Sequence, residues 1–320
     1  MLRSTHFVIA ASRFPIAAAL AILVIVPCAA QENGGLRLSV VGIGPKDYAE
    51  SMNFYTKVMG YKPAFSFSPN GKNHNTYFQV SRDTFIELQE NAGPGLTHMH
   101  MQTGDVDAVV ARLRKAGLAA CSETRKVDCM GNARVAAPTG EKNVAIMDPN
   151  GILIEPTEFI PGSLTRKAMD SWTGNAGTRL LVVGIGVKDY AASETFYEKV
   201  MGFPIAFQFA SPDGKRVTKY YQINRDSFIE MQPVVGATAP GLTHVHILTE
   251  DLAALIARLR QAGLPSVARN ATTPNSVTEA GLVQPSNVKS ANVFDPNGIR
   301  LELNELLPES LTKKAMESWK

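Results

Sequence analysis

Two short stretches hold most of the histidines of this chain. The sequence reads GLTHMHMQT at 95–103 and GLTHVHILT at 241–249, so two histidines flank one apolar residue in each stretch. These are His98 and His100 in the first stretch and His244 and His246 in the second, out of six histidines in the chain. Imidazole titrates near neutral pH and is a common metal ligand, so both stretches are candidates for acid–base or metal chemistry.

Strand alternation places the two histidines of a pair on one face. Residues i and i+2 of a strand point to the same side, so the apolar residue between the histidines takes the other side and should pack under helices. The same test on FIELQ at 85–89 and ILIEP at 152–156 puts Glu87 and Glu155 on the face that carries the histidines. The second copies of these carboxylates are Glu230 and Glu302.

Two imidazoles and two carboxylates are therefore expected to point into each of two concave sheets. A buried carboxylate is costly unless it is paired, protonated or bound to a cation. Imidazole plus carboxylate with open positions suits a divalent first-row metal such as Fe, Mn, Ni or Zn. The alternative is a polar core, in which hydrogen bonds satisfy the histidines and an arginine or a hydrogen-bond donor pairs with each carboxylate.

The two stretches belong to a tandem duplication. VVGIGPKDYAESMNFYTKVMGY at 40–61 returns as VVGIGVKDYAASETFYEKVMGF at 182–203, and DPNGILIE at 148–155 returns as DPNGIRLE at 295–302. The units are 36–172 and 178–320, joined by TGNAG. Each unit reads as strand, helix and three strands, after which the order restarts. This order predicts an α+β fold of four βαβββ modules, in which each unit forms a curved, mostly antiparallel cup with its helices outside.

The order and spacing of the motifs resemble the vicinal oxygen chelate superfamily, which includes glyoxalase I, extradiol dioxygenases and bleomycin-resistance proteins. The resemblance is carried by DYAESMNFYTKVMG at 47–60, by THMHMQTGDVDAVVARLRKAG at 97–117 and by DPNGILIE, and it covers nearly all of the chain after residue 35. It implies metal-ligand positions at His98, Glu155 and Glu87 in the first unit and at His244, Glu302 and Glu230 in the second. The remaining ligand position of the family falls on Val40 and Val182, which cannot bind metal. Because His100 and His246 share the inward face, one of them is expected to take its place, which follows from strand alternation and not from the resemblance.

The resemblance implies a metal-dependent enzyme of the glyoxalase or dioxygenase type that acts on a small oxygenated organic substrate. Its catalytic bases would be drawn from the carboxylates Glu87, Glu155, Glu230 and Glu302. Isomerase or lyase chemistry is favoured over ring cleavage, because Val40 interrupts the set of two histidines and one carboxylate. The alternative is a metal-free binding or sequestration protein, and the two cups need not be equivalent, because Leu153 corresponds to Arg300.

Two further features bear on the cups. In VVGIG, Val40, Gly42 and Gly44 alternate on the inward face, where the glycines either leave space for a bound small molecule or serve close backbone packing. The helix SLTRKAMDSW at 163–172 is expected to be N-capped by Ser163 and to pack each unit against the next. Tyr77 and its copy, Tyr220, either line the cavity or fill it.

The N-terminus reads as a secretory signal. Arg3 and Arg13 accompany the apolar run PIAAALAILVIV and the small residues CAA at 28–30, so residues 1–30 are predicted to be a cleaved signal peptide and the protein to be periplasmic or secreted. No later apolar run approaches membrane length. Without the leader the net charge falls from +3 to +1, and no basic stripe indicates nucleic-acid binding. Cys121 and Cys129 would then remain as candidates for one local disulfide.

Overall fold

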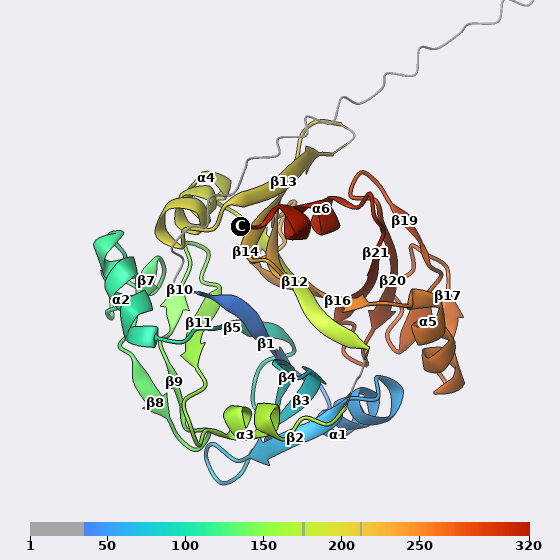
Figure 1. The fold of residues 1–320 in the computed structure, drawn as a ribbon, viewed down its shortest axis with the longest axis horizontal. Helices are drawn as coiled ribbons and strands as arrows, with labels where there is room; N and C mark the ends of the chain where they lie inside the picture. Colours follow the sequence, from blue (N-terminus) through green and yellow to red (C-terminus); the bar gives the residue numbers. More distant parts are fainter. Residues whose placement is uncertain (1–34, 175–176, 212) are drawn as a thin grey trace, which may run out of the picture.

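The computed structural model describes residues 35–174, 177–211 and 213–320. The predicted signal peptide and part of the TGNAG linker lie outside these residues. The described chain folds into two α+β halves, each built on one mixed sheet, with 11 strands in the first sheet and 10 in the second. The expected fold class is confirmed, and the two halves face each other across the middle of the molecule (Figure 1).

The first half contains β1 (Arg37–Gly44), α1 (Tyr48–Asn53), the π-helix η1 (Phe54–Val58), β2 (Lys62–Phe67), β3 (Asn75–Ser81), β4 (Thr84–Gln89), β5 (Gly95–Gln102), α2 (Val106–Lys115), β6 (Ala119–Ala120), β7 (Cys129–Met130), β8 (Arg134–Ala136), β9 (Glu141–Asn143), β10 (Ile146–Met147), β11 (Leu153–Glu158) and α3 (Leu164–Asp170).

The second half contains β12 (Thr178–Val187), α4 (Tyr190–Thr195), η2 (Phe196–Val200), β13 (Ile205–Ala210), β14 (Val217–Asn224), β15 (Ser227–Pro233), β16 (Gly241–Thr249), α5 (Leu252–Gln261), β17 (Ser266–Val267), β18 (Ser276–Thr278), β19 (Gly281–Val283), β20 (Val288–Phe294), β21 (Arg300–Leu306) and α6 (Leu311–Ser318).

Two modules meet in the middle of each sheet. The main path of the first sheet is β2-β3-β4-β1-β5-β11-β10-β7-β6, and that of the second is β13-β14-β15-β12-β16-β21-β20-β18-β17. β1 runs parallel to β4 and antiparallel to β5, and β5 runs parallel to β11. The three strands that carry the acidic and histidine motifs of the first unit are therefore close neighbours, with only β1 between β4 and β5.

Alternation along these strands separates an apolar core from the inside of each cup. Residues such as Val41, Ile86, Met99 and Ile154 are fully buried in one cluster that also includes apolar residues of the second half. A smaller cluster fills the inside of the first cup, made of Val40, Tyr77, Phe85, Phe159, Ala168 and Met169. Its counterpart in the second cup contains Val182, Tyr220 and Phe228. The two-residue period therefore predicted which side of each strand faces which core.

The helix after each DPNG hairpin lies over the cup of its own half, which corrects the expectation that it packs one unit against the next. Ser163 caps α3 as predicted. The buried face of α3 carries Thr165, Ala168 and Met169, and the Gln79 side chain of β3 donates to the carbonyl of Ala168. The equivalent bond joins Gln222 to the carbonyl of Ala315 in α6. Figure 1 shows α3 in the lower part of the molecule and α6 in the upper part, each beside its own sheet.

The DPNG turns, rather than these helices, join the two halves. Asp148 is buried and accepts a hydrogen bond from the Tyr197 hydroxyl of η2 at 3.1 Å. Asn150 donates to the Ser193 hydroxyl of α4 at 2.8 Å. The second unit repeats both contacts in the opposite direction, from Tyr55 to Asp295 and from Asn297 to Ser51. Each hairpin turn is thus also a docking element for the helix of the other half.

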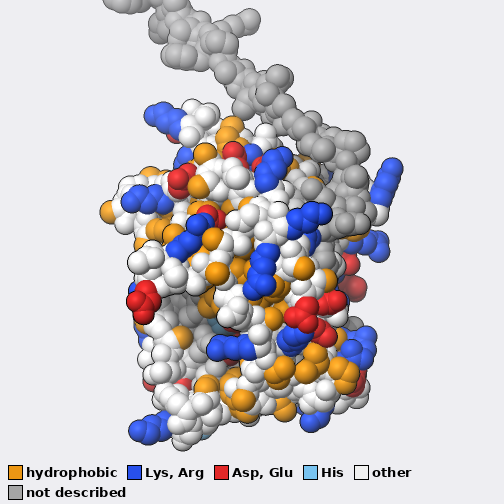
Figure 2. Space-filling view, turned by 90° about the vertical axis from the view of Figure 1, so that its left-hand side faces the viewer, with side chains coloured by type: hydrophobic (Ala, Val, Ile, Leu, Met, Phe, Trp, Pro, Cys, Tyr) orange, Lys and Arg blue, Asp and Glu red, His pale blue; other side chains and the backbone are white. Residues whose placement is uncertain are grey.

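Cys121 and Cys129 form a disulfide across a sequence separation of eight residues. No helix among the described residues is long and apolar enough to cross a membrane. Basic and acidic side chains are scattered over the face shown in Figure 2 rather than gathered into one stripe.

Candidate metal centre

The four candidate ligands of the first unit converge inside the first cup. His98 and His100 on β5 are buried, and their Nε2 atoms lie 2.9 Å apart. Glu87 on β4 places Oε2 3.1 Å from Nε2 of His98, and Glu155 on β11 places Oε2 2.9 Å from Nε2 of His100. The longer diagonals, from His98 to Glu155 and from His100 to Glu87, measure 3.8 and 3.9 Å. One donor atom of each side chain therefore points at a common centre.

The second cup repeats the arrangement with one looser member. The Nε2 atoms of His244 and His246 on β16 lie 2.8 Å apart. Glu230 on β15 places Oε2 3.5 Å from the first and 3.1 Å from the second. Glu302 on β21 lies farther out, with Oε2 4.0 Å from Nε2 of His246. Each cup thus holds a buried His/His/Glu triad whose ligand atoms lie within 4.8 Å of one another, formed by Glu87, His98 and His100 or by Glu230, His244 and His246.

Hydrogen bonds on the far side of each ring direct the Nε2 atoms inward. Thr97 donates its hydroxyl hydrogen to Gln89, so its oxygen accepts from Nδ1 of His98 at 2.8 Å. In the second cup the amide oxygen of Asn304 accepts from Nδ1 of His246 at 2.7 Å. With its proton on Nδ1, a neutral imidazole presents the Nε2 lone pair to the centre, which is the orientation that a metal ligand needs. The sequence analysis did not single out these partners, although Thr97 and Thr243 precede a histidine at the same place in both repeats.

The inward glycines serve close packing, so the expectation that they leave space for a small molecule is wrong. A Cβ at Gly42 would lie 2.1 Å from Cε1 of His98, and a Cβ at Gly184 would lie 2.2 Å from Cε1 of His244. The imidazole rings occupy the volume above these glycines. Gly44 lies under the carbonyl of Gly93, where a Cβ would approach to 2.0 Å. The alternative interpretation of VVGIG, close backbone approach, is therefore the one that holds.

Charge pairing sets the protonation of the first cluster. Burial alone would raise the pKa of Glu87, but the hydrogen bond and charge of His98 outweigh it and lower that pKa. Burial likewise opposes the shift of Glu155, whose pKa falls to about 2 beside His100. The imidazole of His100 shows the reverse, because burial would lower its pKa and the neighbouring Glu155 raises it to about 9. Without a metal, this cluster holds an imidazolium between carboxylates.

The two histidines of the second cup differ in charge. Burial lowers the pKa of His244 and is only partly offset by Glu230. For His246, the charges of Glu302 and Glu230 outweigh burial and raise the pKa. The pKa of Glu230 falls well below its usual value despite burial, because both imidazoles lie beside it. One histidine of the pair is therefore disposed to carry the proton and the other to stay neutral.

Three further buried residues, two tyrosines and one glutamate, surround the clusters. Tyr220 donates its hydroxyl hydrogen to Glu230, and Tyr77 makes the same bond to Glu87, so both tyrosines support a carboxylate rather than only filling space. Glu141 on β9 is almost fully buried near His100 and accepts from Thr165 of α3 at 2.6 Å. Glu141 was not predicted from the sequence, because it lies in the segment 119–142, where the strand pattern is weak.

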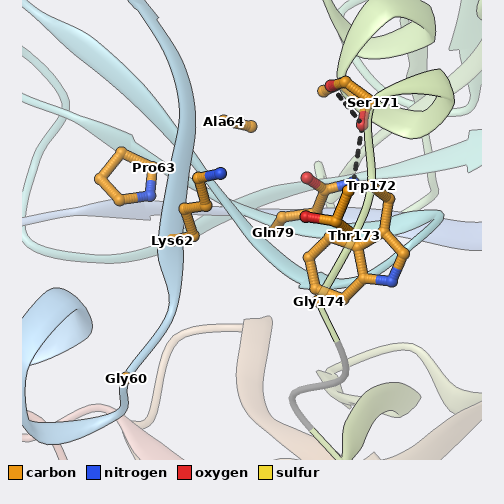
Figure 3. A pocket seen from close by; sticks show the side chains of 10 residues that line it. Gly60, Lys62, Pro63, Ala64, Gln79, Ser171, Trp172, Thr173 and Gly174 are labelled. Carbon is orange, nitrogen blue, oxygen red and sulfur yellow. Dashed lines mark hydrogen bonds between the residues drawn. The ribbon is translucent and has the colours of Figure 1, made fainter.

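Two cavities lie near these elements. One of about 210 Å³ opens onto the second cluster and is lined by Phe209, Tyr220, Glu230, His246, Arg300 and Glu302, among others. Another of about 220 Å³ lies between β2 and the segment after α3, with Lys62 on one side and Trp172 on the other (Figure 3). None of the four candidate ligands lines this second cavity, so it is separate from the candidate centre.

The donor set fits one divalent ion in each cup. Two donors bound at roughly 2.0–2.1 Å lie about 2.9 Å apart at a right angle and about 3.4 Å apart at the tetrahedral angle. The five distances between donor atoms in the first cup run from 2.9 to 3.9 Å, which includes both of these values. The three distances within the triad of the second cup run from 2.8 to 3.5 Å. Val40 lies directly opposite His100 in the β1–β5 register, so β1 supplies no ligand at that point.

The family model that matches this chain is described as Glyoxalase/Bleomycin resistance protein/Dioxygenase superfamily. It matches residues 37–155 and 179–303, once in each half. A search of curated proteins found no match.

Solved structures share the fold at low sequence identity. The Mn(II)-bound glyoxalase from Novosphingobium aromaticivorans is 17% identical with a TM-score of 0.61, and the match covers 84% of this chain and 81% of that one. Homoprotocatechuate 2,3-dioxygenase from Arthrobacter globiformis is also 17% identical with a TM-score of 0.61, covering 89% and 85%. The enzyme of the same name from Brevibacterium fuscum, in complex with 3,4-dihydroxyphenylacetate, is 18% identical with a TM-score of 0.61, covering 86% and 84%. At these identities the likeness establishes the fold alone.

Proposed function

Because the chain belongs to the glyoxalase/bleomycin resistance protein/dioxygenase superfamily, we propose that it is a metal-dependent enzyme that acts on a small oxygenated organic substrate. The observation that carries the proposal is the convergence of two imidazoles and a carboxylate in each cup, with ligand atoms within 4.8 Å of one another. Solved relatives include a Mn(II)-bound glyoxalase, which supports a divalent ion as the occupant. The metal is Fe, Mn, Ni or Zn.

In the first cup, three residues would bind the ion and a fourth could also transfer a proton. His98, His100 and Glu87 are buried and hold the ion. The Glu155 side chain is 16% exposed, against 5% for that of Glu87, so it is the carboxylate better able to exchange a proton with a substrate as well as bind metal. A bound divalent ion supplies a Lewis acid that polarises two adjacent substrate oxygens. Glu302 has the corresponding place in the second cup, with its side chain 15% exposed.

Proton-transfer chemistry is the reaction type that this donor set favours. Each cup holds at least two carboxylates beside its histidines, so one can remain on the metal while another moves a proton. Val40 and Val182 stand where the resemblance places a further ligand, which favours isomerase or lyase chemistry over ring cleavage. The relative in complex with 3,4-dihydroxyphenylacetate supports a substrate with two adjacent oxygens. The predicted signal peptide at residues 1–30 supports an activity in the periplasm or outside the cell.

A metal-free binding protein is the second candidate. The observation that favours it is the mutual pairing of imidazoles and carboxylates, which already satisfies the cluster without an ion, as between His100 and Glu155 at 2.9 Å. The cavity of about 210 Å³ beside the second cluster would then hold an organic ligand.

Elemental analysis of the protein, produced with its own leader and without a histidine tag, separates the two candidates. About one or two equivalents of a transition metal per chain are expected. His98→Ala and His244→Ala should each remove the metal of one cup. His74→Ala is the matched control, because His74 is exposed and pairs with Glu90 away from the cups. Less than about a tenth of an equivalent, even after incubation with each ion, would favour the binding protein.

A further inference from the structure

The two cups share their triads but differ in the residue beside them. In the parallel register of β16 and β21, Arg300 is the partner of His244, and Glu302 is the partner of His246. In the first cup the position opposite His98 is taken by Leu153. Alternation along β21 puts Arg300 on the same face as Glu302, and both residues line the cavity of about 210 Å³.

The guanidinium of Arg300 has no bonding partner among the residues that the structure describes. Arg300 is half-buried, and within residues 35–174, 177–211 and 213–320 its side chain makes no hydrogen bond and no ion pair. A half-buried arginine without a partner retains its donors for a ligand. The positive charge of Arg300 helps to lower the pKa of Glu302, but the two side chains do not form an ion pair.

The balance of charge also differs between the cups. The first cup has a third carboxylate, Glu141, which is almost fully buried. The equivalent residue of the second cup is Val288, so this cup has two carboxylates and a guanidinium. A divalent ion would bring the second cup to a net charge of about +1, whereas the first would carry no positive excess. Exposed arginines do not cancel this difference in charge, because each half has one. Arg134 lies near Glu155 in the first half, and Arg269 lies over Gly281 in the second.

We propose that the second cup is the site for a small organic anion, with Arg300 binding its carboxylate beside the His/His/Glu triad, and that the first cup lacks this anion site. The inference rests on the proposed function and names its substrate class. The planar guanidinium matches a carboxylate in a two-point contact. The cavity is smaller than the pockets that hold drug-sized ligands, and Phe209 and Tyr220 form part of its wall, with ring centroids 6.1 Å apart. These features fit a compact, flat anion.

Calorimetric titration of the zinc-loaded protein tests the inference with two probes that share a hydroxyl-bearing ring and differ in whether the neighbouring group is a carboxylate or a neutral amide. The probes are salicylate and its neutral amide, salicylamide. One salicylate per chain is expected to bind, at least about tenfold more tightly than salicylamide, because a charged hydrogen bond is lost with the amide. Arg300→Leu, which copies the residue of the first cup, should abolish that preference, and Arg300→Lys should retain part of it. Leu153→Arg should create a second salicylate site.

The outcomes separate this inference from the proposed function. Zinc content is measured in every sample, and the titrations are repeated on metal-free protein. Zinc bound in both cups with a salicylate preference that survives Arg300→Leu would overturn the inference and leave the metal enzyme standing. Two equal salicylate sites in the unaltered chain would also overturn it. A protein that takes up none of Fe, Mn, Ni and Zn but binds salicylate through Arg300 would overturn the proposed function and leave the anion site standing.

Discussion

The metal affinity of the first cup should rise steeply with pH. The pKa of His100 is raised to about 9, since the charge of Glu155 outweighs burial, so at pH 7 its imidazole is protonated in the metal-free protein. A metal must displace that proton to reach Nε2. At two pH units below the pKa, only about 1% of the imidazole is neutral. Apparent metal affinity at pH 7 should therefore be about 100-fold below its limit at high pH, which is about 2.7 kcal/mol.

Zinc titration with a competing chromophoric chelator, from pH 6.5 to 8.5, measures this dependence. His244→Ala removes the second site, so that the first is observed alone. Affinity should rise about tenfold per pH unit, and calorimetry in two buffers of different ionisation enthalpy should report about one proton released per zinc at pH 7. Glu155→Gln removes the carboxylate that raises the pKa of His100 and should reduce the protons released per bound zinc. An affinity that stays constant over this range would refute either the protonated state of His100 or its role as a ligand.

Three further outcomes follow from the packing and charge of the same residues. Gly42→Ala should displace the His98 ring and remove metal from the first cup, since its Cβ would lie 2.1 Å from Cε1; unchanged metal content would refute the close approach. Tyr197→Phe should lower the free energy of unfolding by about 1.5–3 kcal/mol in urea titration, because it removes the buried hydrogen bond to Asp148 that joins the halves. The metal-free protein should lose stability as pH rises from 6.5 towards 9, because the folded state binds a proton at His100 that the unfolded state has released; thermal melts that rise over this range would contradict it.

Strand alternation and the duplication predicted which histidines and carboxylates of the two motifs share the inside of each cup. The period of two placed Glu87, His98 and Glu155 on one face, and the structure brings them together from β4, β5 and β11. That result depends only on local geometry and on the order of the modules, because a strand's two faces are fixed once one of them is apolar. The cap of α3 by Ser163 is likewise local and was predicted.

What the sequence analysis missed depends on contacts between distant segments. The ring of His98 occupies the volume above Gly42, and no spacing rule states which side chain fills the space over a glycine on a neighbouring strand. Asp148 reads as a turn residue, yet its carboxylate is buried against a tyrosine 49 positions later in the chain. Glu141 lies on a strand of three residues, which is too short to show a period. Each of these roles depends on how modules meet in space, which hydrophobic periodicity does not encode.

Comparison of the two units within one chain separates what the centre requires from what varies around it. Both keep the glycine under the ring, the threonine before the first histidine and the tyrosine on the carboxylate, at Gly42, Thr97 and Tyr77 in the first unit and at matching positions in the second. A polar core needs only that its groups be satisfied, and many pairings would do so. Keeping the supports that orient Nε2 inward is instead what a metal ligand requires. The divergence falls on residues that surround the triad, such as Leu153 and Arg300, where a change alters which ligand the cup accepts without disturbing the donors.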